Sequence, residues 1–127
     1  MFKTFNRRHH SFSHALSGLY WVLIHHLNFR IHIIISAIVL VAALYFNLSS
    51  TEFIIIVFTI MFGLSAELIN TSIETMTDLI TKEWREEAKI AKDVSAGMML
   101  LVAFGAMIVA LTLFLPHIFN SAQTTPY

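Results

Sequence analysis

Long apolar runs separated by short polar segments organise this chain. Residues 31–48 and 94–119 form two such runs, and a shorter one begins at Phe53. About 18 to 20 apolar residues are enough for a helix to cross the hydrocarbon core of a bilayer. Residues 11–27 instead carry apolar side chains at three- and four-residue spacing, which is typical of an amphipathic helix on a membrane surface, or of an ordinary helix packed on the bundle. We favour the surface helix, so the pattern predicts an all-α integral membrane protein with one surface helix and three transmembrane helices.

The second span is predicted to continue through polar residues, over 53–78. On a helix with 100° per residue, five polar side chains share an arc of about 100° and extend about 16 Å along the axis. They are Glu67, Asn70, Thr71, Glu74 and Asp78. No Lys or Arg lies between Arg30 and Lys82 to neutralise them. Because ionisable groups at membrane depth are costly and usually functional, this polar stripe should face away from lipid and meet a metal, a proton or a basic residue.

Composition agrees with a membrane protein of one domain. The 127 residues are 57% hydrophobic and 13% charged, whereas soluble domains contain about 25% charged residues. The formal net charge is zero, which argues against nucleic acid as a partner. The chain has no Cys, so disulfides and thiolate metal sites are excluded. The N-terminus does not resemble a cleavable signal peptide, because its first apolar run comes late and more membrane-like sequence follows.

The positions of the basic residues predict the orientation in the membrane. The third helix is expected to end at Pro116. With three spans, the segment before the first span and the charge-dense loop 79–93 face the same side of the membrane. That side holds every Lys and Arg, at positions 3, 7, 8, 30, 82, 85, 89 and 92. The positive-inside rule places it in the cytoplasm. The sequence therefore predicts a multi-pass protein of the cytoplasmic (inner) membrane with a cytoplasmic N-terminus and an outer C-terminus.

The polar residues suit phosphoryl transfer at a membrane surface. Carboxylates hold Mg²⁺ through one or two contacts and leave room for phosphate oxygens, and a Lys supplies a positive point charge to a phosphate. A carboxylate at the apolar end of the stripe could accept a proton from an alcohol. Taken alone, these residues leave three functions open: a lipid kinase, a transport or channel protein with a cation or proton pathway, and a structural or assembly subunit.

Four sequence strings carry a family resemblance. They are SFSHALSGL at 11–19, NFRIH at 28–32, GLSAELINTSIETMTDLI at 63–80 and AKIAKDVSAGMMLLVA at 88–103. Together they resemble the small prokaryotic diacylglycerol kinase family, which includes undecaprenol kinases, over about Ser11 to Pro116. The string NFRIH is closer to the undecaprenol kinase branch. Because length and layout also agree, the resemblance favours the lipid kinase over the other two functions.

The resemblance implies roles for individual residues. It implies that Glu67 is the general base for the lipid hydroxyl, that Asn70 positions the reacting groups and that Glu74 holds the metal bound to ATP. It also implies that Lys92 and Asp93 lie near the nucleotide phosphates. The lipid substrate is expected next to Asn28, Phe29, Arg30 and Glu67. The resemblance further implies ATP as co-substrate, Mg²⁺ as the metal, and a homotrimer whose sites are shared between subunits.

One position departs from the family pattern. Three residues before Phe29 the family usually has a second metal-binding Glu, and this chain has His26. Imidazole suits transition metals better than Mg²⁺. The substitution therefore implies either a ligand replaceable by water, or a site with altered metal preference, including Mn²⁺, or reduced activity.

Overall fold

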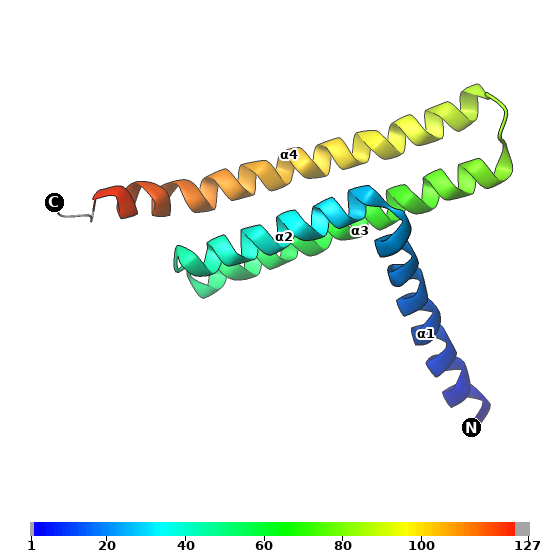
Figure 1. Ribbon diagram of the computed structural model, residues 1–127, viewed down its shortest axis with the longest axis horizontal. Coiled ribbons are helices and arrows are strands. Elements are labelled where there is room, and N and C mark those ends of the chain that lie inside the picture. The colour runs from blue at the N-terminus through cyan, green and yellow to red at the C-terminus, as the bar shows by residue number, and fades with distance from the viewer. Residues whose placement is uncertain (1, 124–127) are drawn as a thin grey trace.

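Four α-helices make up the structure, a computed structural model that describes the backbone of residues 2–123 and the side chains of residues 11–119. They are α1 (Phe2–His25), α2 (Leu27–Tyr45), α3 (Ser50–Ile80) and α4 (Glu86–Gln123). Helices α2 and α4 both pack against α3, while α1 leaves the bundle at a steep angle (Figure 1). Three of the helices, α2 to α4, are long and apolar enough to cross a membrane. The predicted all-α architecture of three spans and an N-terminal helix is confirmed.

Short joints set the path of the chain. A single extended residue, His26 (φ −110°, ψ 111°), separates α1 from α2 and allows the bend between them. At the other end of α2, Asn47 adopts a left-handed conformation (φ 52°). The Leu48 and Asn47 amides bond back to the Ala43 and Leu44 carbonyls, at 3.1 and 3.2 Å, which is a Schellman ending. Helix α3 then begins with a capping box, because Ser49 and Glu52 each satisfy the other's backbone amide.

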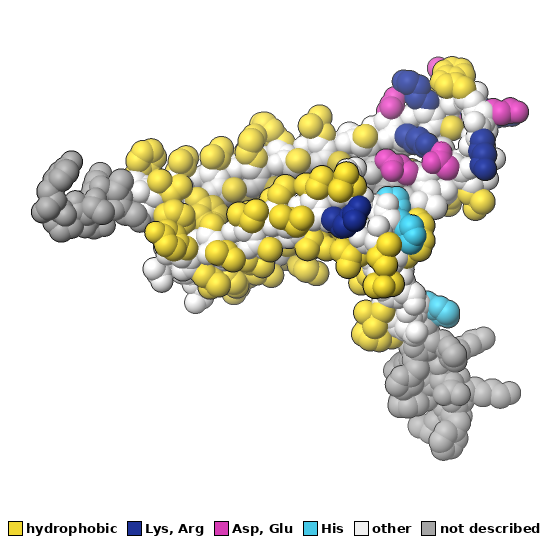
Figure 2. Space-filling model, viewed as in Figure 1, with side chains coloured by type: hydrophobic (Ala, Val, Ile, Leu, Met, Phe, Trp, Pro, Cys, Tyr) yellow, Lys and Arg dark blue, Asp and Glu magenta, His cyan; other side chains and the backbone are white. Residues whose placement is uncertain are grey.

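Apolar side chains cover most of the outer surface. Among the described side chains only five hydrophobic ones are buried, and they are Val22, Phe29, Ala43, Ile56 and Ala66. Exposed Ile, Leu, Val, Phe and Met side chains extend along α2, α3 and α4. Figure 2 shows the apolar body of the bundle, with acidic and basic side chains gathered where α3 joins α4. This surface suits lipid, and the charged end suits the water at one membrane face.

The observed helix ends differ from the predicted ones at several places. Helix α4 begins at Glu86, so the connection to α3 is short and most of the predicted loop 79–93 is helical. Two acidic residues in its first turn favour this start, because negative charge is stabilised at a helix N-terminus. Pro116 lies inside α4 and does not end it, which corrects the prediction. Lost backbone bonds at a proline are tolerated in membrane helices, where neighbouring groups replace them.

Helix α1 also begins earlier than predicted, at Phe2. The basic side chains of Lys3, Arg7 and Arg8 belong to this early part and lie outside the described residues, as do the side chains of the tail 120–127. The α2 and α3 spans start a few residues before the predicted 31 and 53, at Leu27 and Ser50.

Candidate active site

The polar stripe of α3 runs from the interior of the bundle to its charged end. Glu67, Asn70 and Thr71 are only 3%, 6% and 3% exposed, whereas Glu74 is half-buried and Asp78 is exposed. The 31 residues of α3 extend about 46 Å, which exceeds the roughly 30 Å of the hydrocarbon core. Measured from Ser50, the core thickness is used up after about 20 residues. If Ser50 stands at one boundary of the core, Glu67 is just inside the opposite boundary, and Glu74 and Asp78 are beyond it.

Asn70 connects the stripe to α4. Its Nδ2 donates to Glu74 Oε1 on the same helix, at 3.2 Å. Its Oδ1 accepts a hydrogen bond from the Ser95 hydroxyl of α4, at 2.6 Å. Ser95 is 3% exposed. The Asn70 amide thus links α3 to α4, and it also contacts the Glu74 carboxylate at the edge of the buried region.

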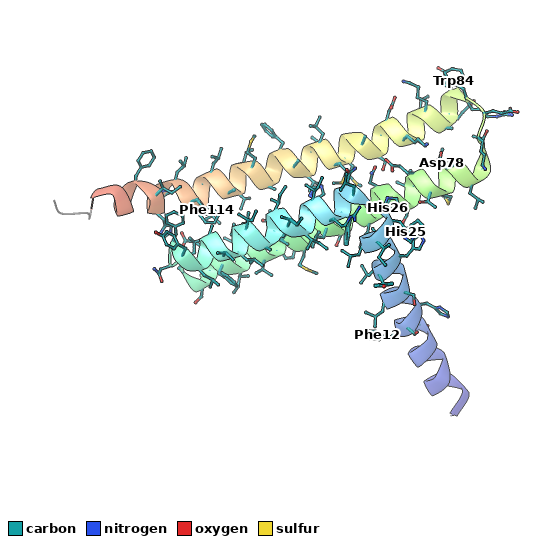
Figure 3. The ribbon with its side chains drawn as sticks, in the orientation of Figure 1. Phe12, His25, His26, Asp78, Trp84 and Phe114 are labelled. Carbon is teal, nitrogen blue, oxygen red and sulfur yellow. The ribbon has the colours of Figure 1, made fainter. Side chains whose placement is uncertain are left out.

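Two of the residues predicted to bind nucleotide, Lys92 and Asp93, each form an ion pair with another residue. The Lys92 ammonium contacts Asp78 across the α3–α4 interface, with Nζ 2.5 Å from Oδ1. The Asp93 carboxylate pairs with Lys89 one turn earlier, at 2.8 Å. Both pairs line a polar groove of about 390 Å³ beneath the connecting segment, which also carries Trp84 (Figure 3). These pairs are well exposed, and exposed pairs contribute only about 1 kcal/mol or less, so a phosphate can displace such a carboxylate from its Lys.

Histidines of the α1–α2 joint lie close to the buried carboxylate. His26 of the joint, His32 of α2 and Glu74 lie near enough to the Glu67 carboxyl to interact with it electrostatically. The His26 ring is half-buried, with its centroid 5.2 Å from that of Trp21. No three His, Asp or Glu side chains within residues 11–119 form a group able to enclose a metal. A single half-buried carboxylate, Glu74, fits Mg²⁺ that arrives with a nucleotide, because Mg²⁺ needs only one or two carboxylates when phosphates supply other ligands.

An apolar groove separates α1 from the C-terminal half of α3. Its volume is about 760 Å³, and Gly18 and Trp21 of α1 face Leu68 and Met76 of α3 across it. Thr71, one turn from Glu67, also lines the groove. The Thr71 hydroxyl is the only buried side-chain polar atom without a hydrogen-bond partner in the part of the chain whose side chains are described. The groove therefore combines an apolar lining, a spare hydroxyl and a nearby buried carboxylate.

Comparison with known proteins identifies the family. The family model described as prokaryotic diacylglycerol kinase matches residues 13–114. The chain belongs to the prokaryotic diacylglycerol kinase family. A diacylglycerol kinase of Synechocystis is 35% identical over 111 residues, which cover 87% of this chain and 63% of that protein. An undecaprenol kinase of Bacillus subtilis is 37% identical over 113 residues, which cover 89% of this chain and 92% of that protein.

Membership in the prokaryotic diacylglycerol kinase family confirms the prediction of a lipid kinase family made from the four strings. The chain spans just under two thirds of the Synechocystis protein and nearly all of the Bacillus subtilis protein. The two relatives have different names and nearly equal identities, so identity alone does not choose the acceptor lipid.

The structure brings most of the predicted residues of this kinase family to one end of the bundle. Glu67, Asn70 and Glu74 follow one face of α3, and Lys92 of α4 contacts Asp78 at the exposed end of that face. Of the four residues predicted near the lipid, Asn28 and Arg30 are exposed on α2, while Phe29 and Glu67 are buried, at 5% and 3% exposure.

Sequence reasoning missed Ser95 as a polar residue of the site. The available signal was its position three residues after Lys92, which places both on one face of a helix. That signal requires α4 to begin before Lys92, as it does at Glu86.

Proposed function

We propose that this protein transfers the γ-phosphate of ATP to the hydroxyl of a membrane lipid alcohol, either undecaprenol or diacylglycerol. The observation that supports it most is the gradient along one helix face, from the buried Glu67 to the exposed Asp78 paired with Lys92. A lipid hydroxyl reaches the boundary of the hydrocarbon core, and a nucleotide approaches from water. The polar stripe crosses that boundary, so it offers a buried carboxylate to the lipid hydroxyl and exposed charged groups to the nucleotide.

In the proposed reaction, the Glu67 carboxylate accepts the proton of the lipid hydroxyl as its oxygen forms a bond to the γ-phosphorus. The bond from that phosphorus to the bridging oxygen breaks, and ADP leaves. Such a transfer depends mainly on positioning and on stabilising the charge of the phosphoryl oxygens. Lys92 supplies positive charge to the phosphates, and Asn70 holds Glu74 in place. Mg²⁺ bound through Glu74 would neutralise phosphate charge.

The groove between α1 and α3 is the place we propose for the lipid chain. Its lining is mostly apolar, and it passes Thr71, one turn along α3 from Glu67. A hydrocarbon chain in this groove brings its terminal hydroxyl toward the general base, while Asn28 and Arg30 remain at the headgroup level. The spare Thr71 hydroxyl can then bond to an oxygen of the lipid head.

We further propose that the charged end faces the cytoplasm, with the N-terminus on that side and the C-terminus outside, in a homotrimer. Every Lys and Arg of the sequence then lies on the cytoplasmic side. The few buried hydrophobic side chains of the single chain leave large apolar faces on α3 and α4, which neighbouring subunits or lipid can cover. Cross-linking of the purified protein in detergent would count the subunits.

Transfer of labelled γ-phosphate from ATP to undecaprenol and to diacylglycerol, assayed side by side in mixed micelles, tests the proposal. We expect a labelled phospholipid product from one of them, and none from folded Glu67→Gln protein. No product with either lipid would contradict the proposal.

A second measurement separates the kinase from a cation pathway or an assembly subunit. A ligand at 100 times its Kd stabilises a folded protein by roughly 2.7 kcal/mol. Mg²⁺ with ATP should therefore raise the thermal unfolding temperature of a kinase. A protein of the other two kinds should show no nucleotide-dependent shift.

A further inference from the structure

The Ser95 hydroxyl bonds differently from the other hydroxyls of the long helices. Several of them donate to the carbonyl four residues earlier on their own helix, as is common for Ser and Thr. These are Thr59, Ser65, Ser72, Thr75, Thr77 and Thr112. Ser95 instead donates to Asn70 on the neighbouring helix, at 2.6 Å, and both residues are buried. The Ser95 hydroxyl therefore forms a hydrogen bond between α4 and α3.

The chemistry of the Glu74 carboxylate, the Asn70 amide and the Ser95 hydroxyl fixes which group donates in each of the two hydrogen bonds. An ionised Glu74 can only accept, so the Asn70 amide must turn its NH₂ toward Glu74. The amide oxygen then faces α4, and Ser95 has to be the donor there. Without that donor, no other side chain among residues 11–119 donates to the amide oxygen, and a buried acceptor without a partner is costly. The amide would gain by rotating, and rotation would withdraw its NH₂ from Glu74.

We infer that Ser95 is a positioning residue for the nucleotide side of the reaction. It holds the Asn70 amide in the one orientation that places its NH₂ on Glu74, and so fixes the carboxylate that meets the metal-bound nucleotide. Ser95 itself touches neither substrate. This inference rests on the proposed function, and it adds a residue whose role follows from its hydrogen bond alone.

The bond network predicts a selective effect on the two substrates. Glu74 stands at the water-facing part of the stripe, while the lipid groove is lined by Ser72 and Met76 on other faces of α3 and meets the stripe only at Thr71. Loss of the Ser95 donor should therefore affect Mg-ATP and leave the lipid unaffected. A serine that only packs α4 against α3 would instead lower stability and change both KM values together or neither.

The experiment measures KM for Mg-ATP, KM for the lipid and kcat in the full-length protein and in Ser95→Ala. We expect KM for Mg-ATP to rise on the order of tenfold, as for loss of a buried hydrogen bond, with KM for the lipid unchanged. The Mg-ATP concentration that gives half of the full thermal stabilisation should rise by a similar factor. This second readout requires no catalysis.

Three variants serve as controls. Ser95→Thr keeps a hydroxyl and should recover much of the Mg-ATP affinity. Ser95→Cys keeps the approximate size of the side chain but is a weak donor, so it should show the same rise in KM for Mg-ATP. It therefore tests the loss of the donor even where Ser95→Ala folds poorly. Ser65→Ala removes an exposed hydroxyl that bonds only within α3, and should match the parent.

The outcomes distinguish this inference from the proposed function. An active parent whose Ser95→Ala and Ser95→Cys variants keep the parent KM for Mg-ATP overturns the role of Ser95 alone. Equal changes in both KM values overturn it as well. A folded parent that neither transfers phosphate nor gains stability from Mg-ATP overturns the proposed function, and the role of Ser95 with it.

Discussion

Lys92 of α4 and Asp78 of α3 form an ion pair at the charged end of the bundle, next to the segment that joins the two helices. The Lys92 side chain is 40% exposed, so solvent and ligands reach it. The pair keeps the predicted phosphate-binding Lys beside the carboxylate stripe before any nucleotide arrives. Because exposed pairs are weak, Asp78 guides the Lys to this position without holding it against a phosphate.

Replacing Lys92 by Met should weaken nucleotide binding. A hydrogen bond to a charged group contributes about 1.5 to 3 kcal/mol, so KM for Mg-ATP should rise roughly 10- to 100-fold. The effect is measured by initial rates over a range of Mg-ATP concentrations. Lys82→Met, which removes an exposed positive charge from the connecting segment, is the matched control and should change KM much less. Equal effects of the two substitutions would mean that only overall charge matters.

Glu67→Gln should abolish most of the chemical step while leaving nucleotide binding nearly intact. The amide keeps the shape of the side chain but cannot accept the lipid proton, and general bases contribute on the order of 10²- to 10⁴-fold. We expect kcat to fall by that factor. The rise in unfolding temperature that Mg-ATP causes should stay the same as in the parent. Glu83→Gln, at an exposed position, should behave like the parent. If Glu67→Gln lost ATP affinity at an unchanged kcat, Glu67 and Glu74 would have to exchange roles.

Glu74→Gln should act on the metal-bound nucleotide instead. The amide oxygen can still accept from Asn70, so the hydrogen bond survives while the charge that attracts the metal is lost. KM for Mg-ATP should rise, and added Mg²⁺ should recover part of the rate. A titration of Mg²⁺ at fixed ATP measures the change. A variant with parental Mg²⁺ dependence would remove Glu74 from the metal site.

Substitutions at His26 test whether the residue that departs from the family pattern binds metal. If its imidazole is a metal ligand, Mn²⁺ should support activity better than Mg²⁺, because imidazole prefers transition metals. His26→Glu should then restore ordinary Mg²⁺ dependence and raise activity at low Mg²⁺. His26→Ala serves as the control for loss of the ring, which also packs near Trp21. Parental behaviour of both variants with either metal would show that His26 is no ligand and that water fills its position.

Periodicity in the sequence predicted the helices because burial in lipid leaves few alternatives to a helix. The inward direction of the α3 stripe followed from the same rule, since Glu67 could not face lipid. The start of α4 was missed because charged residues at 86–93 resemble a loop, although acidic residues in a first turn and a Lys–Asp pair one turn apart stabilise a helix.

Contacts between helices could not be predicted in the same way. The bond from Ser95 to Asn70 joins residues 25 positions apart, and it depends on the register of α4 against α3. A serine among alanines and glycines gives no sign of that register. The role of Pro116 was also misjudged, because its effect on a helix depends on neighbours that a single segment does not contain.

The length of α3 makes the enzyme sensitive to the thickness of its membrane. Glu67 lies about 26 Å along the helix from Ser50, so a thin bilayer would raise it into the headgroups and a thick one would submerge Asn70 and Glu74. Hydrophobic mismatch costs fractions of a kcal/mol per Å and is relieved by tilting. If Glu67 acts as proposed, phosphorylation should consequently have an optimum in acyl-chain length of the host lipid, set by how deep α3 holds this carboxylate.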